Sequence, residues 1–209
     1  SQSFADLGGV WNVDGGYTFY TLNNYGIMYA FLVDSEITPK TYKEALKHDN
    51  LTLIENNFGE KDVAKQLGNV DVIFLFDVLL HQVDPNWDVI LEKYSRITNC
   101  FAVFNPQWVM SEETVRLLDL GIEGYFENVP HAREHSEYKA LFEHIYDIHP
   151  HYKKYWRDIP DVWQWGITDN DLSQKMERLG FISKHFENYG QFASLKNFEN
   201  HAFLFQKDS

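Results

Sequence analysis

The 209 residues suffice for one substantial hydrophobic core, and length alone favours one domain over two. Eighteen lysine and arginine residues against 31 aspartate and glutamate residues give a formal net charge of −13. A negative field of that size repels nucleic-acid phosphates and anionic lipid surfaces, so we expect neither a nucleic acid nor a membrane as partner.

The single cysteine, Cys100, excludes an internal disulfide, and no apolar run is long enough to span a bilayer. The chain start, Ser1-Gln2-Ser3-Phe4, shows no signal-peptide pattern. These features are typical of a reducing, intracellular setting, and we expect a cytoplasmic protein.

Short apolar runs alternate with helix-like stretches through the first half of the chain. The expected strands are Gly9–Asp14, Met28–Val33, Leu51–Glu55, Val70–Phe76 and Cys100–Phe104. The expected helices between them are Thr18–Asn24, Pro39–Lys47, Glu60–Gly68 and Trp87–Ile97. This alternation predicts an α/β fold with a doubly wound, mostly parallel sheet, whose ligands bind at the carboxyl ends of the strands.

The rhythm changes over residues 111–166, which are rich in histidine, tyrosine and tryptophan. Expected helices here are Glu112–Leu120 and Glu134–Ile148. We interpret this segment as a helical insertion, or cap, after the fifth strand and within a single domain that covers residues 1–209. It would lie over the edge of the sheet.

The last part of the chain returns to regular elements. Thr168–Leu179 is an expected helix that Thr168 caps and Gly180 ends. Phe181–Asn188 and His201–Gln206 are expected to form an antiparallel pair, which completes seven strands.

Five segments in this order resemble the class I S-adenosylmethionine-dependent methyltransferase superfamily over nearly the whole chain. They are Val10–Thr18 (VWNVDGGYT), Asp34, Asn56-Asn57-Phe58, Phe76–Val83 (FDVLLHQV) and Trp165–Phe181, which ends in LGF. The resemblance implies the seven-stranded, Rossmann-like methyltransferase fold and S-adenosylmethionine as cofactor.

The glycine loop of that family, commonly hhDhGxGxG, is matched in part. Asn12 stands where the family usually has Asp, Asp14 stands at the first Gly, and Gly16 fits the central Gly. The resemblance implies that Asp14, Gly15 and Gly16 bind the cofactor, because small residues let the backbone approach it closely. An ordinary β-turn after a buried strand is the alternative.

The resemblance also assigns roles to residues after later strands. Asp34 would accept hydrogen bonds from the ribose hydroxyls, which suits a carboxylate with two acceptor oxygens. Asn57 and Phe58 would contact the adenine, and Asp77 would lie beside the reactive end of the cofactor. A polar turn at Asn57 and a turn-capping role for Asp77 are the alternatives.

Three histidines are candidate general bases: His81, His131 and His135. Imidazole suits this role because its ordinary pKa lies near neutrality. For His81, a packing role is the alternative. His131–His135 also fits the HxxEH pattern of one zinc peptidase class, but the pattern is short and Pro130 precedes it, so we expect no metal site.

The expected activity is methyl transfer from S-adenosylmethionine to a small molecule, such as a sugar or another metabolite, bound under the aromatic cap. Two alternatives remain: a non-catalytic protein of this fold that binds a partner, and an enzyme with another cofactor or reaction. The departures at Asn12, Asp14 and Thr18 motivate the first; Thr18 stands where the family often has the last Gly of the loop. The oligomeric state is open, with a homodimer as one arrangement. A lid over the cofactor would come from further N-terminal sequence, the insertion or a second subunit.

Overall fold

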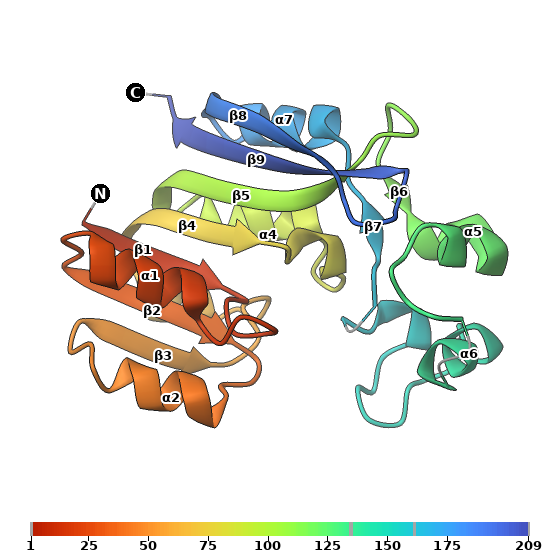
Figure 1. The fold of residues 1–209 in the computed structure, drawn as a ribbon, viewed down its shortest axis with the longest axis horizontal. Helices are drawn as coiled ribbons and strands as arrows, with labels where there is room; N and C mark the ends of the chain where they lie inside the picture. The colour runs from red at the N-terminus through yellow and green to blue at the C-terminus, as the bar shows by residue number, and fades with distance from the viewer. Residues whose placement is uncertain (1, 134–135, 161, 209) are drawn as a thin grey trace.

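The computed structural model describes residues 2–133, 136–160 and 162–208. Seven strands form one sheet in the order β3-β2-β1-β4-β5-β9-β8 (Figure 1). Their bounds are β1 Ser3–Leu7, β2 Tyr29–Asp34, β3 Leu51–Glu55, β4 Val70–Phe76, β5 Thr98–Trp108, β8 Phe181–Gln191 and β9 Phe198–Lys207. The first five run parallel, and β9 pairs antiparallel with β5 and β8. The predicted mostly parallel, seven-stranded α/β fold is confirmed.

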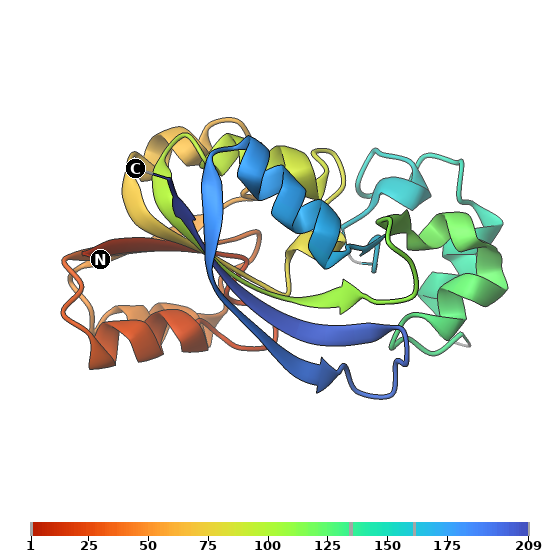
Figure 2. The same ribbon diagram turned by 90° about the horizontal axis from the view of Figure 1, so that it is seen from above.

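Helices cover both faces of the sheet (Figures 1 and 2). The helices α1 (Gly16–Asn24) and α2 (Pro39–Ala45) lie on one face, and α3 (Val63–Leu67), α4 (Trp87–Tyr94) and α7 (Asp169–Arg178) lie on the other. The main core lies between the second group and the sheet, where Ile73 and Leu75 of β4 are fully buried. On the other face of β4, Val72, Phe74 and Phe76 are half-buried, so both faces are covered and the strand is an almost unbroken apolar run.

Local sequence signals fix the ends of two helices. Thr38 precedes α2, and its hydroxyl accepts a hydrogen bond from the amide of Thr41 at 3.1 Å. Thr168 caps α7 in the same way, accepting from the amide of Asp171 at 3.2 Å. Gly180 follows α7 with φ +83°, a backbone conformation that favours glycine. The predicted cap and end of α7 are confirmed.

The expected first strand, Gly9–Asp14, is wrong, because the strand lies at Ser3–Leu7. The segment that reads as a strand is instead a coiled loop, with Asn12 at φ 59° and Asp14 at φ 49°. Amides of Val13 and Asp14 both donate to the carbonyl of Val10. Val10 is apolar because it packs beneath this loop in a small cluster with Leu32 and Ile37, and not because it belongs to a strand.

Residues 111–166, the cap segment, leave the sheet after β5 and return before α7 (Figure 1). They contain β6 (Val115–Arg116), the 3-10 turn η2 (Leu117–Leu120), α5 (Gly121–Glu127), α6 (Ser136–Glu143), the 3-10 turn η3 (Trp156–Asp158) and β7 (Trp165–Gly166), with β6 paired to β7. The expected helix Glu112–Leu120 is wrong, since β6 and η2 occupy it. The expected helix Glu134–Ile148 is shorter, and its first two residues lie outside the described part.

The cap segment has an apolar cluster of its own. Trp163 packs against Phe198 of β9 and Phe192, with ring centroids 5.2 and 5.4 Å apart, and Trp108 at the end of β5 also contacts Phe198. The cap is therefore fixed to the ends of β5 and β9 by aromatic packing. None of the helices in the described ranges combines the length and apolar character that crossing a bilayer requires.

Candidate functional site

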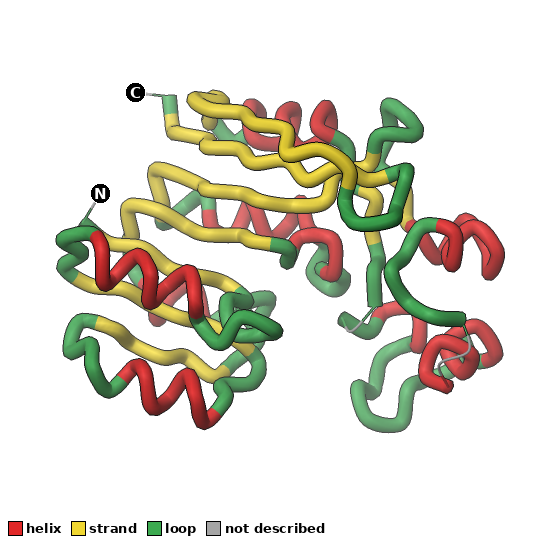
Figure 3. Tube along the Cα trace, in the orientation of Figure 1, coloured by secondary structure: helices red, strands yellow, loops and turns green. Residues whose placement is uncertain are grey.

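The carboxyl ends of β1, β2 and β4 lie side by side, because these strands are neighbours in the sheet and run in the same direction. In Figures 1 and 3 the loops that follow them emerge at one edge of the sheet. Ligands of open α/β sheets bind at this edge. We therefore build the candidate site from the residues that follow these three strands.

The turn directly after β1 contains Gly8 and Gly9. Gly8 has φ +79°, and its amide donates to the carbonyl of Val33 in β2 at 2.7 Å. A Cβ atom at Gly8 would lie 2.6 Å from Cγ1 of Val78. At Gly9 it would lie 2.3 Å from Oδ2 of Asp6. Both positions require glycine, because only glycine lets the turn pack this closely against its neighbours.

The structure places Gly15 and Gly16 farther along, at the start of α1. Gly15 precedes α1 with φ 78°, and a Cβ atom there would meet Phe19 and Leu32 at 2.8 and 2.9 Å. It therefore permits α1 to pack on β2. Gly16 is exposed, and a Cβ atom there would meet nothing within 4 Å. Contact of either glycine with a cofactor stays a prediction.

Asp14 lies on the same loop and is held by α2. Thr38 donates to Oδ1 at 2.8 Å, and Lys40 donates to Oδ2 at 2.8 Å. These hydrogen bonds, first that of Lys40, hold the pKa of Asp14 below its usual range. The carboxylate thus anchors the loop to the start of α2, and its predicted contact with the cofactor is untested.

Asp34 closes β2, as predicted, and is 9% exposed. Its Oδ2 accepts a hydrogen bond from the amide of Val10 at 2.9 Å, and the hydroxyl of Ser35 lies 3.4 Å from Oδ1. The carboxylate is therefore oriented by the loop that follows β1. Its position at the edge leaves Oδ1 as the less strongly engaged acceptor.

Asp6 is a further carboxylate in this region, on β1, and is 1% exposed. Thr18 of α1 donates to its Oδ2 at 2.7 Å, and Oδ1 has no hydrogen-bond partner among the described residues. The pKa of Asp6 is raised to about 7, and burial is the main cause. The hydrogen bond from Thr18 opposes this rise, and the negative charge of Asp34 adds to it. Asp6 therefore titrates near neutral pH.

Asp77 follows β4 with φ 57°, and its amide donates to the carbonyl of Phe104 at 2.7 Å. The side chain is exposed, yet surrounding protein desolvates the carboxylate and raises its pKa to about 6. Burial also raises the pKa of Tyr17 on α1, and the negative charges of Asp77 and Asp6 add to this effect. The phenol of Tyr17 is thus close enough to both carboxylates to sense their charge.

Asn57 and Phe58 are held by local contacts. Oδ1 of Asn57 accepts from the amide of Gly59 at 2.7 Å, which closes a turn. Phe58 is 7% exposed and belongs to the main core, and its carbonyl accepts from the hydroxyl of Tyr94 at 2.7 Å. Their predicted adenine contacts stay predictions.

His81 lies in η1 (Leu79–His81), between the loop after β1 and the cap segment. Its Nδ1 is 3.0 Å from the carbonyl oxygen of Val162, and its ring meets Trp11 edge-on with centroids 6.5 Å apart. Because a carbonyl only accepts, Nδ1 donates in this contact, which orients the imidazole. Trp11 is 73% exposed although it is the largest side chain type.

His131 lies in the cap segment, where its ring stacks on Tyr138 with centroids 4.4 Å apart. His135, the last residue of the HxxEH pattern, lies outside the described residues. Within the described ranges, no group of three or more His, Cys, Asp or Glu side chains is suited to hold a metal ion.

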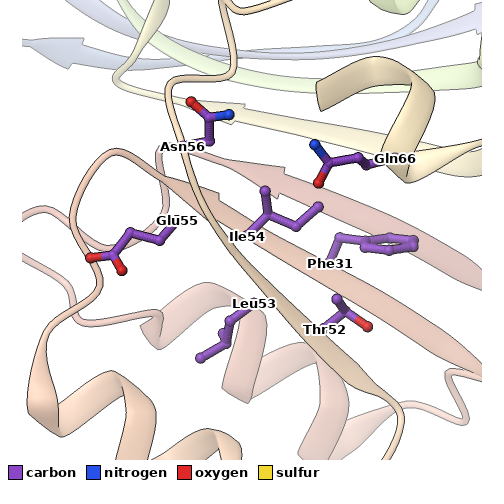
Figure 4. Close-up of a pocket in the computed structure, with 7 residues that line it drawn as sticks. All are labelled: Phe31, Thr52, Leu53, Ile54, Glu55, Asn56 and Gln66. Carbon is purple, nitrogen blue, oxygen red and sulfur yellow. The ribbon is translucent and has the colours of Figure 1, made fainter. Parts of the chain in front are cut away.

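Two hollows lie away from the β1–β4 edge. One, of about 490 Å³, runs along β3 and ends at Asn56, directly after that strand. Figure 4 shows Glu55 on one side of this strand and Phe31 and Gln66 on the other. The second, of about 410 Å³, lies in the cap and is lined by Ile122, Phe126, Arg133, Lys139, Phe142 and Glu143.

Sequence reasoning missed Asp6 and Trp11. The signal for Asp6 was present, because Phe4-Ala5-Asp6-Leu7-Gly8-Gly9 follows the start of the family pattern hhDhGxG more closely than the later glycine pair does. Trp11 was assigned to a strand, so its exposure at the site was not expected.

No protein-family model matches the chain, and no curated protein matches it. Solved structures do. The chain is similar to the 1,6-didemethyltoxoflavin-N1-methyltransferase of Burkholderia thailandensis with bound 1,6-didemethyltoxoflavin and S-adenosylhomocysteine (11% identity, TM-score 0.62, covering 99% of this chain and 71% of that chain). It is also similar to the N-terminal domain of EvdMO1 in the presence of S-adenosylhomocysteine and D-fucose (15%, 0.60, 99% and 76%).

A third similar structure is magnesium protoporphyrin IX methyltransferase from Synechocystis PCC 6803 with bound S-adenosylmethionine (8% identity, TM-score 0.56, 98% of this chain and 69% of that chain). At such identities the likeness concerns the fold. The chain has the fold of the class I S-adenosylmethionine-dependent methyltransferases, as the order of its motifs predicted.

Proposed function

We propose that the protein is a methyltransferase that uses S-adenosylmethionine and acts on a small molecule. The observation that carries this proposal is the position of Asp34, Asp6 and Asp77 at the carboxyl ends of β2, β1 and β4, around a two-glycine turn. A cofactor with a positively charged sulfonium suits an edge that collects three carboxylates, and ribose hydroxyls suit the less engaged oxygen of Asp34.

The residues present fit this group. Asp34 is oriented by the amide of Val10, and the Gly8–Gly9 turn brings backbone close to the edge. When bound, S-adenosylmethionine supplies an electrophilic methyl group. The chain would then hold the acceptor in line with that group and exclude water.

His81 is the general base that the geometry favours. The contact with Val162 orients the imidazole beside Trp11, and imidazole is suited to take a proton from an oxygen or nitrogen nucleophile. We also propose His131 and His135, which belong to the cap segment, as candidate bases.

A small acceptor accords with the net charge of −13, which disfavours nucleic acid, and with the exposed indole of Trp11 beside His81. Flat rings and sugar faces both pack on an indole. We propose an acceptor with such a face and a cytoplasmic location.

Isothermal titration calorimetry with S-adenosylmethionine and S-adenosylhomocysteine tests the proposal. We expect both to bind, and absence of binding by either would overturn the cofactor assignment and favour a non-catalytic protein of this fold. One observation favours the non-catalytic alternative: Oδ2 of Asp34 already accepts a hydrogen bond from the amide of Val10.

Asp34→Ala should weaken cofactor binding by about 1–3 kcal/mol, because charge-assisted hydrogen bonds to the ribose are lost. Asp34→Asn should lose less, since an amide oxygen still accepts from Val10. Asp62→Ala, at an exposed carboxylate near α3, is the control. Equal affinity of wild type and Asp34→Ala would show that the ribose site lies elsewhere.

A further inference from the structure

The carboxylate of Asp6 is enclosed without a compensating cation. It is 1% exposed, one oxygen accepts from Thr18, and the other has no partner among the described residues. The carboxylate lies directly against the backbone of Gly9, within 2.3 to 2.6 Å of where a Cβ atom would stand. A buried carboxyl group in this state favours its neutral, protonated form.

The titratable groups that face Asp6 are all acidic. Asp34 lies on β2, Tyr17 and Thr18 lie on α1, and Asp77 follows β4 and acts on the same phenol. In the described ranges, no lysine or arginine forms an ion pair with Asp6, Asp34 or Asp77. Lys40 of α2, which contacts the loop after β1, is paired with Asp14. An arriving cation would therefore meet an uncompensated acidic cluster.

An acidic cluster of this kind can respond to the difference in charge between the proposed substrate and its product. S-adenosylmethionine carries a sulfonium that the thioether product lacks, while the other charged groups of the two molecules are the same. We propose, on the basis of the function proposed above, that Asp6 makes the site prefer the cationic cofactor over its neutral product, by releasing its proton to solvent when the cation binds. Asp6 would thus be a specificity-determining residue beneath the glycine turn.

The proposal predicts a pH dependence with a definite sign. A nearby positive charge stabilises the carboxylate and lowers its pKa, so cofactor affinity rises with pH through the range near 7 where free Asp6 loses its proton. If the cation lowers the pKa by about one unit, affinity for S-adenosylmethionine rises about fivefold from pH 6 to pH 8. Affinity for S-adenosylhomocysteine should change much less.

Calorimetry of the wild-type protein at pH 7, in buffers of different ionisation enthalpy, counts the protons released. We expect about 0.4 proton more for S-adenosylmethionine than for S-adenosylhomocysteine. Equal release and an equal pH dependence for the two ligands would overturn the proposal while leaving the function intact. If neither ligand binds, the proposed function fails and this inference fails with it.

Variants assign the proton to Asp6. In Asp6→Asn the difference in proton release should disappear, whereas Asp62→Asn should retain it. Thr18→Val removes the bond that favours the charged form, so the pH profile should move to higher pH, and Thr18→Ser should restore it. An unmoved profile in Thr18→Val, together with unchanged proton release in Asp6→Asn, would assign the proton to another group such as Asp77.

Discussion

The sheet edge and the cap segment differ in whether their acidic residues have cationic partners. In the cap, Asp158 pairs with Arg116 at 2.7 Å, Asp119 with Arg157 at 2.7 Å, and Glu123 with Arg133 at 2.6 Å. At the edge, Asp6, Asp34 and Asp77 have no such cation within the described ranges. The chain has arginines, and they are placed where they stabilise the cap. The unpaired acids therefore mark the edge as the place where an external cation is expected.

Removing the buried charge at the edge should have the largest effect on stability. The pKa of Asp6 is raised to about 7 in the folded protein, above its unfolded value near 3.8, so its contribution to stability is present below pH 4 and lost as pH rises through 7. Asp6→Asn should therefore be more stable than wild type at pH 8, by about 4 kcal/mol.

Urea unfolding of both proteins from pH 5 to pH 8 measures this difference, which should shrink as pH falls. Asp62→Asn, at an exposed carboxylate, should show no comparable trend. An advantage of Asp6→Asn that is the same at every pH would mean that Asp6 does not titrate as described.

Crowding the glycine turn should have the next largest effect. Gly9→Ala forces a methyl group against the carboxylate of Asp6 and should destabilise the fold by about 3 kcal/mol. Gly16→Ala is the matched control, because nothing lies within 4 Å of the added atom and alanine favours a helix. Thermal unfolding compares the two. Equal stability of both variants would contradict the close approach at Gly9.

Removing an arginine from the cap should lower the stability of the fold, whereas Asp6→Asn should raise it. Arg116 is 17% exposed, donates to Asp158 and Gln164, and its loss leaves the carboxylate of Asp158 without its partner. Arg116→Ala should destabilise the protein by about 2 kcal/mol, less than a fully buried pair because Asp158 is partly exposed. Lys65→Ala, in an exposed pair, should cost at most about 0.5 kcal/mol by the same urea assay.

The smallest effect is expected at Gln107, at the end of β5. Its side chain is 0% exposed, and neither amide atom has a hydrogen-bond partner among the described residues. Gln107→Met keeps the volume and removes the unsatisfied polar atoms, so it should stabilise the fold by about 1 kcal/mol. A loss of stability on chemical denaturation would show that the amide is bonded in solution.

Most of the sheet could be predicted because its buried strands appear in the sequence as short apolar runs. Val70–Phe76 was located to the residue because both faces of this strand are covered, which makes it apolar at every position but Asp71. The capped helix at Thr168 was equally clear, since its signals are local. The mostly parallel sheet followed from the alternation of such elements, and the methyltransferase fold followed from the order of the motifs.

The first strand and the cap were not predictable in the same way. Asp6 interrupts an apolar strand, and its burial is decided by Thr18 and Asp34, which are distant in sequence. Val10 and Trp11 resemble strand residues, yet one packs under a loop and the other is exposed. In the cap, pairing of Val115–Arg116 with Trp165–Gly166 overrides the helical pattern of the residues that follow. Long-range contacts therefore determined the parts that local patterns missed.

The bonds between η1 and the end of the cap have a mechanical consequence. The carbonyls of Leu80 and Gln82 accept from Gln164 and from the indole of Trp165, at 3.0 and 2.7 Å, and His81 contacts Val162. Residues 162–165 therefore move together with the end of β4. The amide of Gln164 should therefore exchange its hydrogen as slowly as the sheet does.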